Sequence, residues 1–76
     1  MYKVEFVKSD DKTITFDNVE KIQFGKNHER LITLNEHQIL NEFFPRDGYF
    51  HFVCKSSNVS YHDNDTVYVV IKKLDT

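Results

Sequence analysis

Two histidine patterns in the sequence contain residue types that can bind a metal. His28 and Glu29 begin like the His-Glu-x-x-His pattern of zinc proteases, but position 32 is isoleucine and the flanking residues predict a loop, whereas that motif requires a helix. His51 and Cys54 are three residues apart, a spacing that joins two ligands on a helix but sends them to opposite faces of a strand. Neither pattern predicts a metal site.

The acidic segment Asp63-Asn64-Asp65 begins like a calcium-binding loop. It lacks the glycine that follows in such loops and the bidentate glutamate at their twelfth position. Aspartate and asparagine also favour turns through local hydrogen bonds, so we expect a solvated turn at 62–65. The single cysteine is too few for a thiolate zinc cage. We therefore expect no metal and no cofactor.

Nucleophilic catalysis is disfavoured by the surroundings of the one candidate nucleophile. Cys54 shares a predicted strand face with Phe50 and Phe52, which indicates a buried thiol rather than an activated one. Only two glycines are present, 23 positions apart, so there is no glycine-rich phosphate loop. A chain this short leaves little room for a pocket of the usual ~300 Å³ or more. We expect no catalytic residue and no enzymatic activity.

The elements that must position these residues are mostly strands. Alternation of apolar and polar residues predicts strands over 2–8, 13–17 and 19–24, and apolar runs predict strands over 30–34, 49–54 and 66–71. Residues 59–61 are a candidate for a further short strand. Asp17 and Asn18 are expected to form a break between the strand that ends at 17 and the strand that begins at 19. The period changes at Asn35, where Gln38 completes a capping-box pattern. A helix over 36–44 follows, with an apolar face of Ile39, Leu40, Phe43 and Phe44, and Pro45 ends it.

These elements predict one α+β domain over residues 1–76. It consists mainly of an antiparallel β meander of five to six strands, or a curled small barrel, with one short helix at about 36–44 packed on a face of the sheet. A sequence with 39% hydrophobic and 29% charged residues is typical of a globular protein. No apolar run approaches the ~20 residues of a membrane-spanning helix. The first residues lack the apolar block of a signal peptide, so we expect a cytoplasmic protein.

The remaining candidate for function is a second apolar face of the sheet. If the helix covers the face of Phe50 and Phe52, the opposite side carries a row of aromatic and aliphatic side chains, namely Tyr49, His51, Val53, Tyr68 and Val70. Such a row is typical of a protein-binding face. Alternatively, a sheet curled into a barrel hides part of the row in its core. Self-association through this face, or through an exposed edge strand such as 2–8, is a rival use.

Net charge bears on the identity of the partner. The formal charge is −2 and the longest basic run is Lys72-Lys73, which argues against a nucleic-acid partner. The alternative function is a small β-barrel that binds single strands by stacking bases on exposed aromatics beside those lysines, with Tyr49, Phe50, His51, Phe52 and Tyr68 as the platform. A homo-oligomeric structural protein is a further alternative.

The main expectation is a small non-catalytic protein-binding module. The sequence is rich in residues with AT-rich codons and has no alanine, a usage typical of low-GC bacteria and their phages. We therefore expect a phage or mobile-element accessory protein that inhibits or modulates a host protein.

Overall fold

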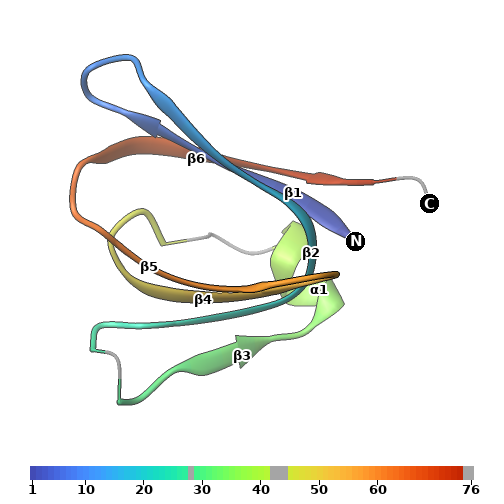
Figure 1. Cartoon of the computed structure of the whole chain (residues 1–76). Helices are drawn as coiled ribbons and strands as arrows, with labels where there is room; N and C mark the ends of the chain where they lie inside the picture. Colours follow the sequence, from blue (N-terminus) through green and yellow to red (C-terminus); the bar gives the residue numbers. More distant parts are fainter. Residues whose placement is uncertain (28, 42–44, 75–76) are drawn as a thin grey trace.

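The structure is a computed structural model and describes residues 1–27, 29–41 and 45–74. Six strands and one short helix are present in that part of the chain: β1 (Tyr2–Lys8), β2 (Thr13–Gly25), β3 (Ile32–Leu34), α1 (Glu36–Asn41), β4 (Gly48–Cys54), β5 (Asn58–Asp63) and β6 (Thr66–Lys73) (Figure 1). All strand pairs are antiparallel, in the order β5-β4-β2-β1-β6, and β3 pairs with β2. The predicted class, mainly antiparallel sheet with one short helix, is confirmed. The two end strands of the order do not pair, so the sheet is not closed.

Strand β2 bends sharply and belongs to both layers of the sheet. Its pairing shifts register on either side of Val19, first against β1 and then against β4, and Asn18 has a φ of 54°. Extra residues of this kind bend a strand and increase its twist. The first half of β2 therefore pairs with β1, and the second half pairs with β3 and β4 (Figure 1). The predicted break at Asp17 and Asn18 is wrong, because these residues form a bulge within one strand.

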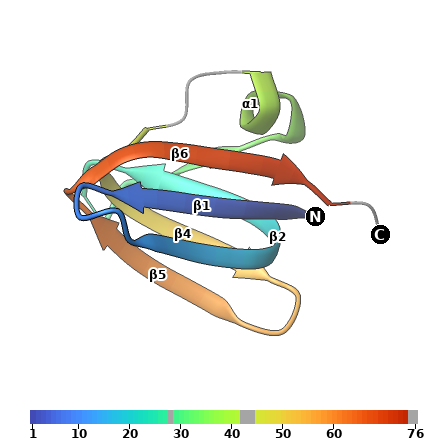
Figure 2. The same cartoon turned by 90° about the horizontal axis from the view of Figure 1, so that it is seen from above.

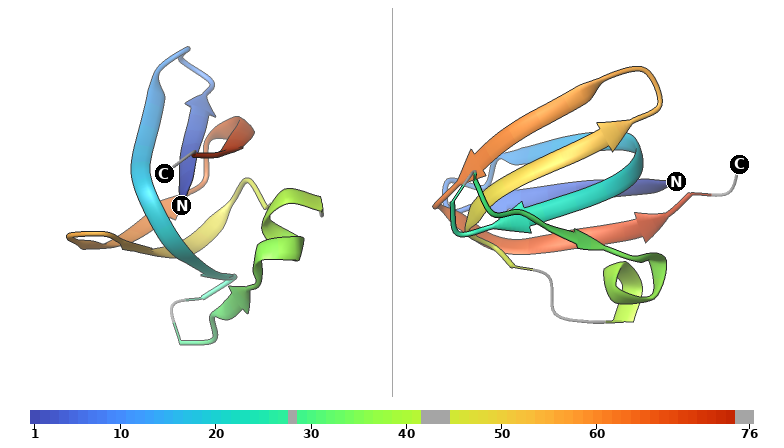
Figure 3. Two further views of the ribbon diagram at one scale, coloured as in Figure 1. Left: turned by 90° about the vertical axis from the view of Figure 1, so that its right-hand side faces the viewer. Right: turned by 90° about the horizontal axis from the view of Figure 1, so that it is seen from below.

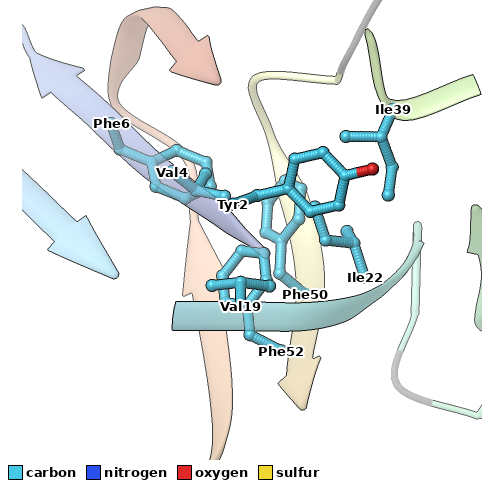
Figure 4. Packing of buried hydrophobic residues seen from close by; sticks show 8 residues of the cluster. All are labelled: Tyr2, Val4, Phe6, Val19, Ile22, Ile39, Phe50 and Phe52. Carbon is cyan, nitrogen blue, oxygen red and sulfur yellow. The ribbon is translucent and has the colours of Figure 1, made fainter. Parts of the chain in front are cut away.

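The core fills the space between the two layers. Phe6 on β1 lies 5.1 Å from Phe50 and 6.1 Å from Phe52 on β4, measured between ring centroids, and Phe16 on β2 lies 4.8 Å from Phe52. The buried cluster consists of Tyr2, Val4, Phe6, Val19, Ile22, Ile39, Phe50 and Phe52 (Figure 4). Apolar side chains from opposite halves of the chain thus cover each other, and the burial of this area stabilises the fold.

Helix α1 begins at the predicted capping box. The Asn35 side chain accepts a hydrogen bond from the backbone N–H of Gln38 at 2.9 Å, and the Gln38 side chain accepts one from the N–H of Asn35 at 3.0 Å. The helix lies beside β6 and the end of β3 (Figures 2 and 3), and it inserts Ile39 into the core. It therefore closes one end of the space between the layers and does not cover a face of the sheet. The predicted helical residues 42–44 lie outside the described residues.

Strand β1 lies inside the sheet, between β2 and β6. A backbone hydrogen bond from Leu74 N to Met1 O, 2.9 Å long, extends its pairing with β6 beyond both strands. The prediction that residues 2–8 form an exposed edge strand is therefore wrong, because both of its edges are paired.

Each of the two glycines allows a close approach of backbone, Gly48 to the end of β2 and Gly25 to the loop that follows β2. Gly48 has a φ of 128°, a conformation that favours glycine. A Cβ atom at this position would lie 2.8 Å from the carbonyl oxygen of Gly25, and one at Gly25 would lie 2.3 Å from that of Arg30. Both positions therefore exclude a side chain for structural reasons.

Candidate interaction surfaces

The predicted binding face is divided between two surfaces that point in opposite directions. Tyr49, His51 and Val53 lie on the outer side of β4, because Phe50 and Phe52 on the same strand face the core. Tyr68 and Val70 lie on the outer side of β6, in the other layer (Figure 1). Since the inner sides of the two layers face each other, their outer sides face away from each other. The five residues are all outside the buried core, but they do not form one row.

The first surface, the β6 patch, consists of Val7, Tyr68 and Val70. Val7 on β1 lies directly opposite Tyr68 on β6, and Glu5 lies opposite Val70. Tyr68 is 52% exposed, and its ring makes no ring contact or hydrogen bond with another residue of the described part. Among the phenylalanine and tyrosine residues of the described part of the chain, Tyr68 alone has a largely exposed side chain. The patch therefore presents an unpartnered aromatic side chain between two aliphatic ones.

A β-bulge borders the β6 patch. The pairing of β6 with β1 shifts register between Val7 and Lys8, and this leaves Val67 as an extra residue on β6. Val67 is 50% exposed, and its carbonyl oxygen accepts a hydrogen bond from Arg46 at 3.1 Å. Bulges commonly redirect side chains next to functional surfaces. Here the bulge adds a second exposed apolar side chain beside Tyr68.

Charged side chains form a rim on the same outer side. Lys72 lies 3.9 Å from Glu5 across the β1–β6 pair, and the lysine side chain is largely exposed. An exposed pair of this kind adds little to stability. A polar rim around an apolar centre is, however, the usual arrangement of a protein interface.

The second surface, the β4 patch, consists of Tyr49, His51, Val53 and His62. Its polar and aromatic groups already have partners within the molecule. The rings of Tyr49 and His62 stack with centroids 4.3 Å apart, and the Nδ1 atom of His51 lies 3.1 Å from Oε1 of Gln23. Gln23 in turn donates a hydrogen bond to the hydroxyl of Thr33 at 3.0 Å. A partner on this surface would have to compete with these contacts.

The aromatic platform expected for a single-strand-binding protein is not formed. Phe50 and Phe52 are buried, with 2% and 0% exposure, and their rings cannot stack on bases. Lys72 is near Glu5, and Lys73 pairs with Glu36 at 3.0 Å. Both lysines of the longest basic run therefore have acidic neighbours.

A buried polar cluster was missed by the sequence analysis. Asp63 is 1% exposed and ends β5, where it accepts hydrogen bonds from Nζ of Lys8 at 2.7 Å and from the Tyr61 hydroxyl. The backbone N–H of Asp65 donates a further bond to it at 2.9 Å. The prediction of a solvated turn is wrong for this residue. The burial of Asp63 could have been predicted from the alternation of Val59, Tyr61 and Asp63, which continues the inward side of β5 to position 63.

Burial and hydrogen bonds set the protonation states of Asp63 and Tyr61 in this cluster. Burial alone raises the pKa of Asp63, but the bonds from Lys8 and Tyr61 outweigh that effect and hold the pKa well below its usual range. Burial, together with the neighbouring Asp63 carboxylate, raises the pKa of Tyr61 to about 12. The tyrosine therefore stays protonated and the aspartate stays ionised at neutral pH. The cluster links the end of β1 to the end of β5, and we assign it a structural role.

The metal and nucleophile candidates are separated by the strand geometry. His51 lies on the outer side of β4, whereas Cys54 is half-buried beside the core, as expected for a three-residue spacing on a strand. Burial raises the pKa of the Cys54 thiol, which disfavours the reactive thiolate. His28, the first residue of the protease-like pattern, lies outside the described residues.

An open hollow lies where β1 begins, beside the bend of β2 and the start of α1. Its volume is about 410 Å³, which corrects the expectation that the chain has little room for a pocket. Its lining comes from four elements and from the residues next to them: Met1, Tyr2, Glu20, Lys21, Thr33, Leu34, Asn35, Glu36 and Ile39. Glu36 in this lining pairs with Lys73 at 3.0 Å and contacts the Tyr2 hydroxyl, so its carboxylate already has partners within the molecule.

No family model matches the sequence, and comparison with curated proteins and with solved structures found no match. Within the described ranges, no helix has the length and apolar character needed to cross a membrane.

Proposed function

We propose that this protein is a small non-catalytic protein-binding module whose contact surface is the β6 patch. The observation that carries the proposal is the exposure of Tyr68, which is 52% accessible, has no partner within the described part and lies beside Val7 and Val70. Tyrosine is enriched among the residues that dominate the energy of protein interfaces, because it buries a large rigid area at low entropic cost. The β4 patch is the weaker candidate, because its groups already contact one another.

We further propose a biological setting for this binding module. The residue usage supports a phage or mobile-element accessory protein in the cytoplasm that inhibits or modulates a host protein. A small domain with one exposed aromatic centre suits this role, since it needs only a single contact surface on its target.

A capture experiment tests the proposed surface. We expect tagged full-length protein to recover one stoichiometric partner from a lysate of its own host, identified by mass spectrometry. Tyr68→Glu places a charge at the centre of the patch, and we expect it to weaken binding of the purified partner by at least about tenfold, as measured by calorimetry. Because Tyr68 is exposed, the variant is expected to keep its circular dichroism spectrum.

Two matched variants test whether the loss of binding is specific to the β6 patch. Ser56→Glu introduces the same charge in the exposed β4–β5 turn and is expected to bind like the parent protein. Tyr49→Glu introduces it on the β4 patch. Normal binding by Tyr68→Glu together with loss of binding by Tyr49→Glu would move the contact surface to β4 and contradict the proposal.

A further inference from the structure

The outer edge of β5 carries a row of backbone groups without strand partners. β5 is an end strand of the sheet, and β4 alone pairs with it in the described part of the chain. The hydrogen bond from Cys54 N to Ser57 O, 2.8 Å long, fixes which residues point toward β4. Because hydrogen-bonded and non-hydrogen-bonded pairs alternate in an antiparallel ladder, the N–H and C=O groups of Asn58, Ser60 and His62 point away from β4.

From Asn58 to His62 this edge lacks the features by which proteins usually prevent strand pairing, and the inward-pointing charge of β5, Asp63, is at its end. Residues 58–63 include no lysine and no proline, and the β4–β5 register has no bulge. The other end strand is different: on β6, Arg46 occupies the carbonyl oxygen of Val67, and α1 lies alongside (Figure 2). The edge of β5 is therefore open to a further strand.

We propose that β5 pairs with β5 of a second copy of this chain, antiparallel and about a twofold axis at Ser60. In this register Asn58 lies opposite His62 and Val59 lies opposite Tyr61, so outward residues meet outward residues and inward residues meet inward ones. Asn58, Ser60 and His62 are then the hydrogen-bonded positions, which are the residues whose backbone groups are unpaired in the monomer. The half-buried side chains of Val59 and Tyr61 gain apolar cover from each other across the interface.

The charges along the chain agree with this register. No residue from 58 to 62 has an acidic side chain or a lysine or arginine, so the axis brings no such like charges together. Asp63, the acidic residue at the end of β5, lies opposite Ser57 in this register, and its carboxylate is already paired with Lys8. The paired residues of β5 are therefore free of like-charge repulsion in this register.

The dimer leaves the proposed binding surface free. β5 and β6 are at opposite ends of the strand order, so the two β6 patches of a dimer remain accessible. The dimer proposal and the β6-patch proposal therefore fail or succeed independently.

Sedimentation equilibrium of the full chain over a range of concentrations tests the pairing. We expect the mass to rise from the 9.1 kDa of the monomer toward twice that value. Ser60→Lys and Ser60→Asp each place like charges opposite one another at the axis, and each is expected to weaken dimerisation by at least about tenfold. An equimolar mixture of the two variants places unlike charges there and is expected to restore the dimer.

The matched control applies the same substitutions at Thr15, an exposed position on β2, where neither single variant is expected to change the mass. A parent protein that stays monomeric at every concentration overturns the proposal, and the open edge then suits an extended segment of another protein. Ser60 variants that dimerise like the parent, or a mixture that gains nothing over its components, also overturn it. Amide exchange at Asn58, Ser60 and His62 is expected to slow as concentration rises.

Discussion

Replacing Phe6 with alanine is expected to remove most of the free energy of unfolding of the protein at room temperature. The Phe6 ring is fully buried and contacts Phe50 and Phe52 in the opposite layer, so its removal leaves a cavity at the centre of the core. Phenylalanine-to-alanine changes in a core cost about 3–5 kcal/mol. A domain of this size has a free energy of unfolding near the lower end of the ~5–15 kcal/mol range. Urea denaturation followed by circular dichroism measures the loss.

Two variants of the same strand serve as controls. Phe6→Leu keeps most of the volume and is expected to cost less than about 2 kcal/mol. Val7→Ala removes apolar atoms from the outward side of β1 and is expected to cost about 1 kcal/mol or less, because Val7 is only half-buried. Equal losses for Phe6→Ala and Val7→Ala would contradict the arrangement of the core described here.

The second large effect is expected at Asp63, as a change in the pH dependence of stability. The folded protein holds the pKa of this carboxyl below its ordinary value of 3.8. The unfolded chain therefore takes up the proton first on acidification, and stability is lost as the pH falls from about 5 toward the folded pKa. Asp63→Asn removes the charge that Lys8 contacts and is expected to cost about 2 kcal/mol at pH 7. Its stability is expected to change less with pH below 5.

Denaturation midpoints measured between about pH 7 and pH 2 test this expectation. Asp17→Asn removes a carboxylate at an exposed position on β2 and is expected to follow the parent curve. An Asp63→Asn variant whose stability falls with acid as steeply as that of the parent would show that other carboxylates cause the acid sensitivity.

Local patterns in the sequence were sufficient to predict most of the elements. Period-two alternation identified β1, an apolar run identified β4, and alternation along β4 assigned Phe50 and Phe52 to the opposite side from Tyr49 and His51. The capping box at Asn35 and Gln38 gave the start of α1, because both of its hydrogen bonds are local. These predictions depend on neighbouring residues only.

The predictions that were wrong depend on residues distant in the sequence. Asp17 and Asn18 are typical turn residues, and their place in a bulge depends on β1 and β4 pairing with the two halves of β2. Asp63 is buried because Lys8, 55 positions away, supplies the opposite charge. Tyr49 and Tyr68 were placed on one face because alternation does not reveal the strand order, which puts them in opposite layers.

The position of β1 between β2 and β6 also determines how the chain must assemble. Hairpins such as β1–β2 and β4–β5 close short loops and form within microseconds, whereas joining β6 to β1 closes a loop that contains nearly the whole chain. Until β6 docks, the backbone groups of Lys3, Glu5 and Val7 form an open edge. Lys3 and Glu5 place charges of both signs beside that edge, and charged side chains protect an unpaired strand against aggregation. Lys3 and Glu5, which lie outside the buried core, thus protect β1 against pairing with other chains until β6 docks.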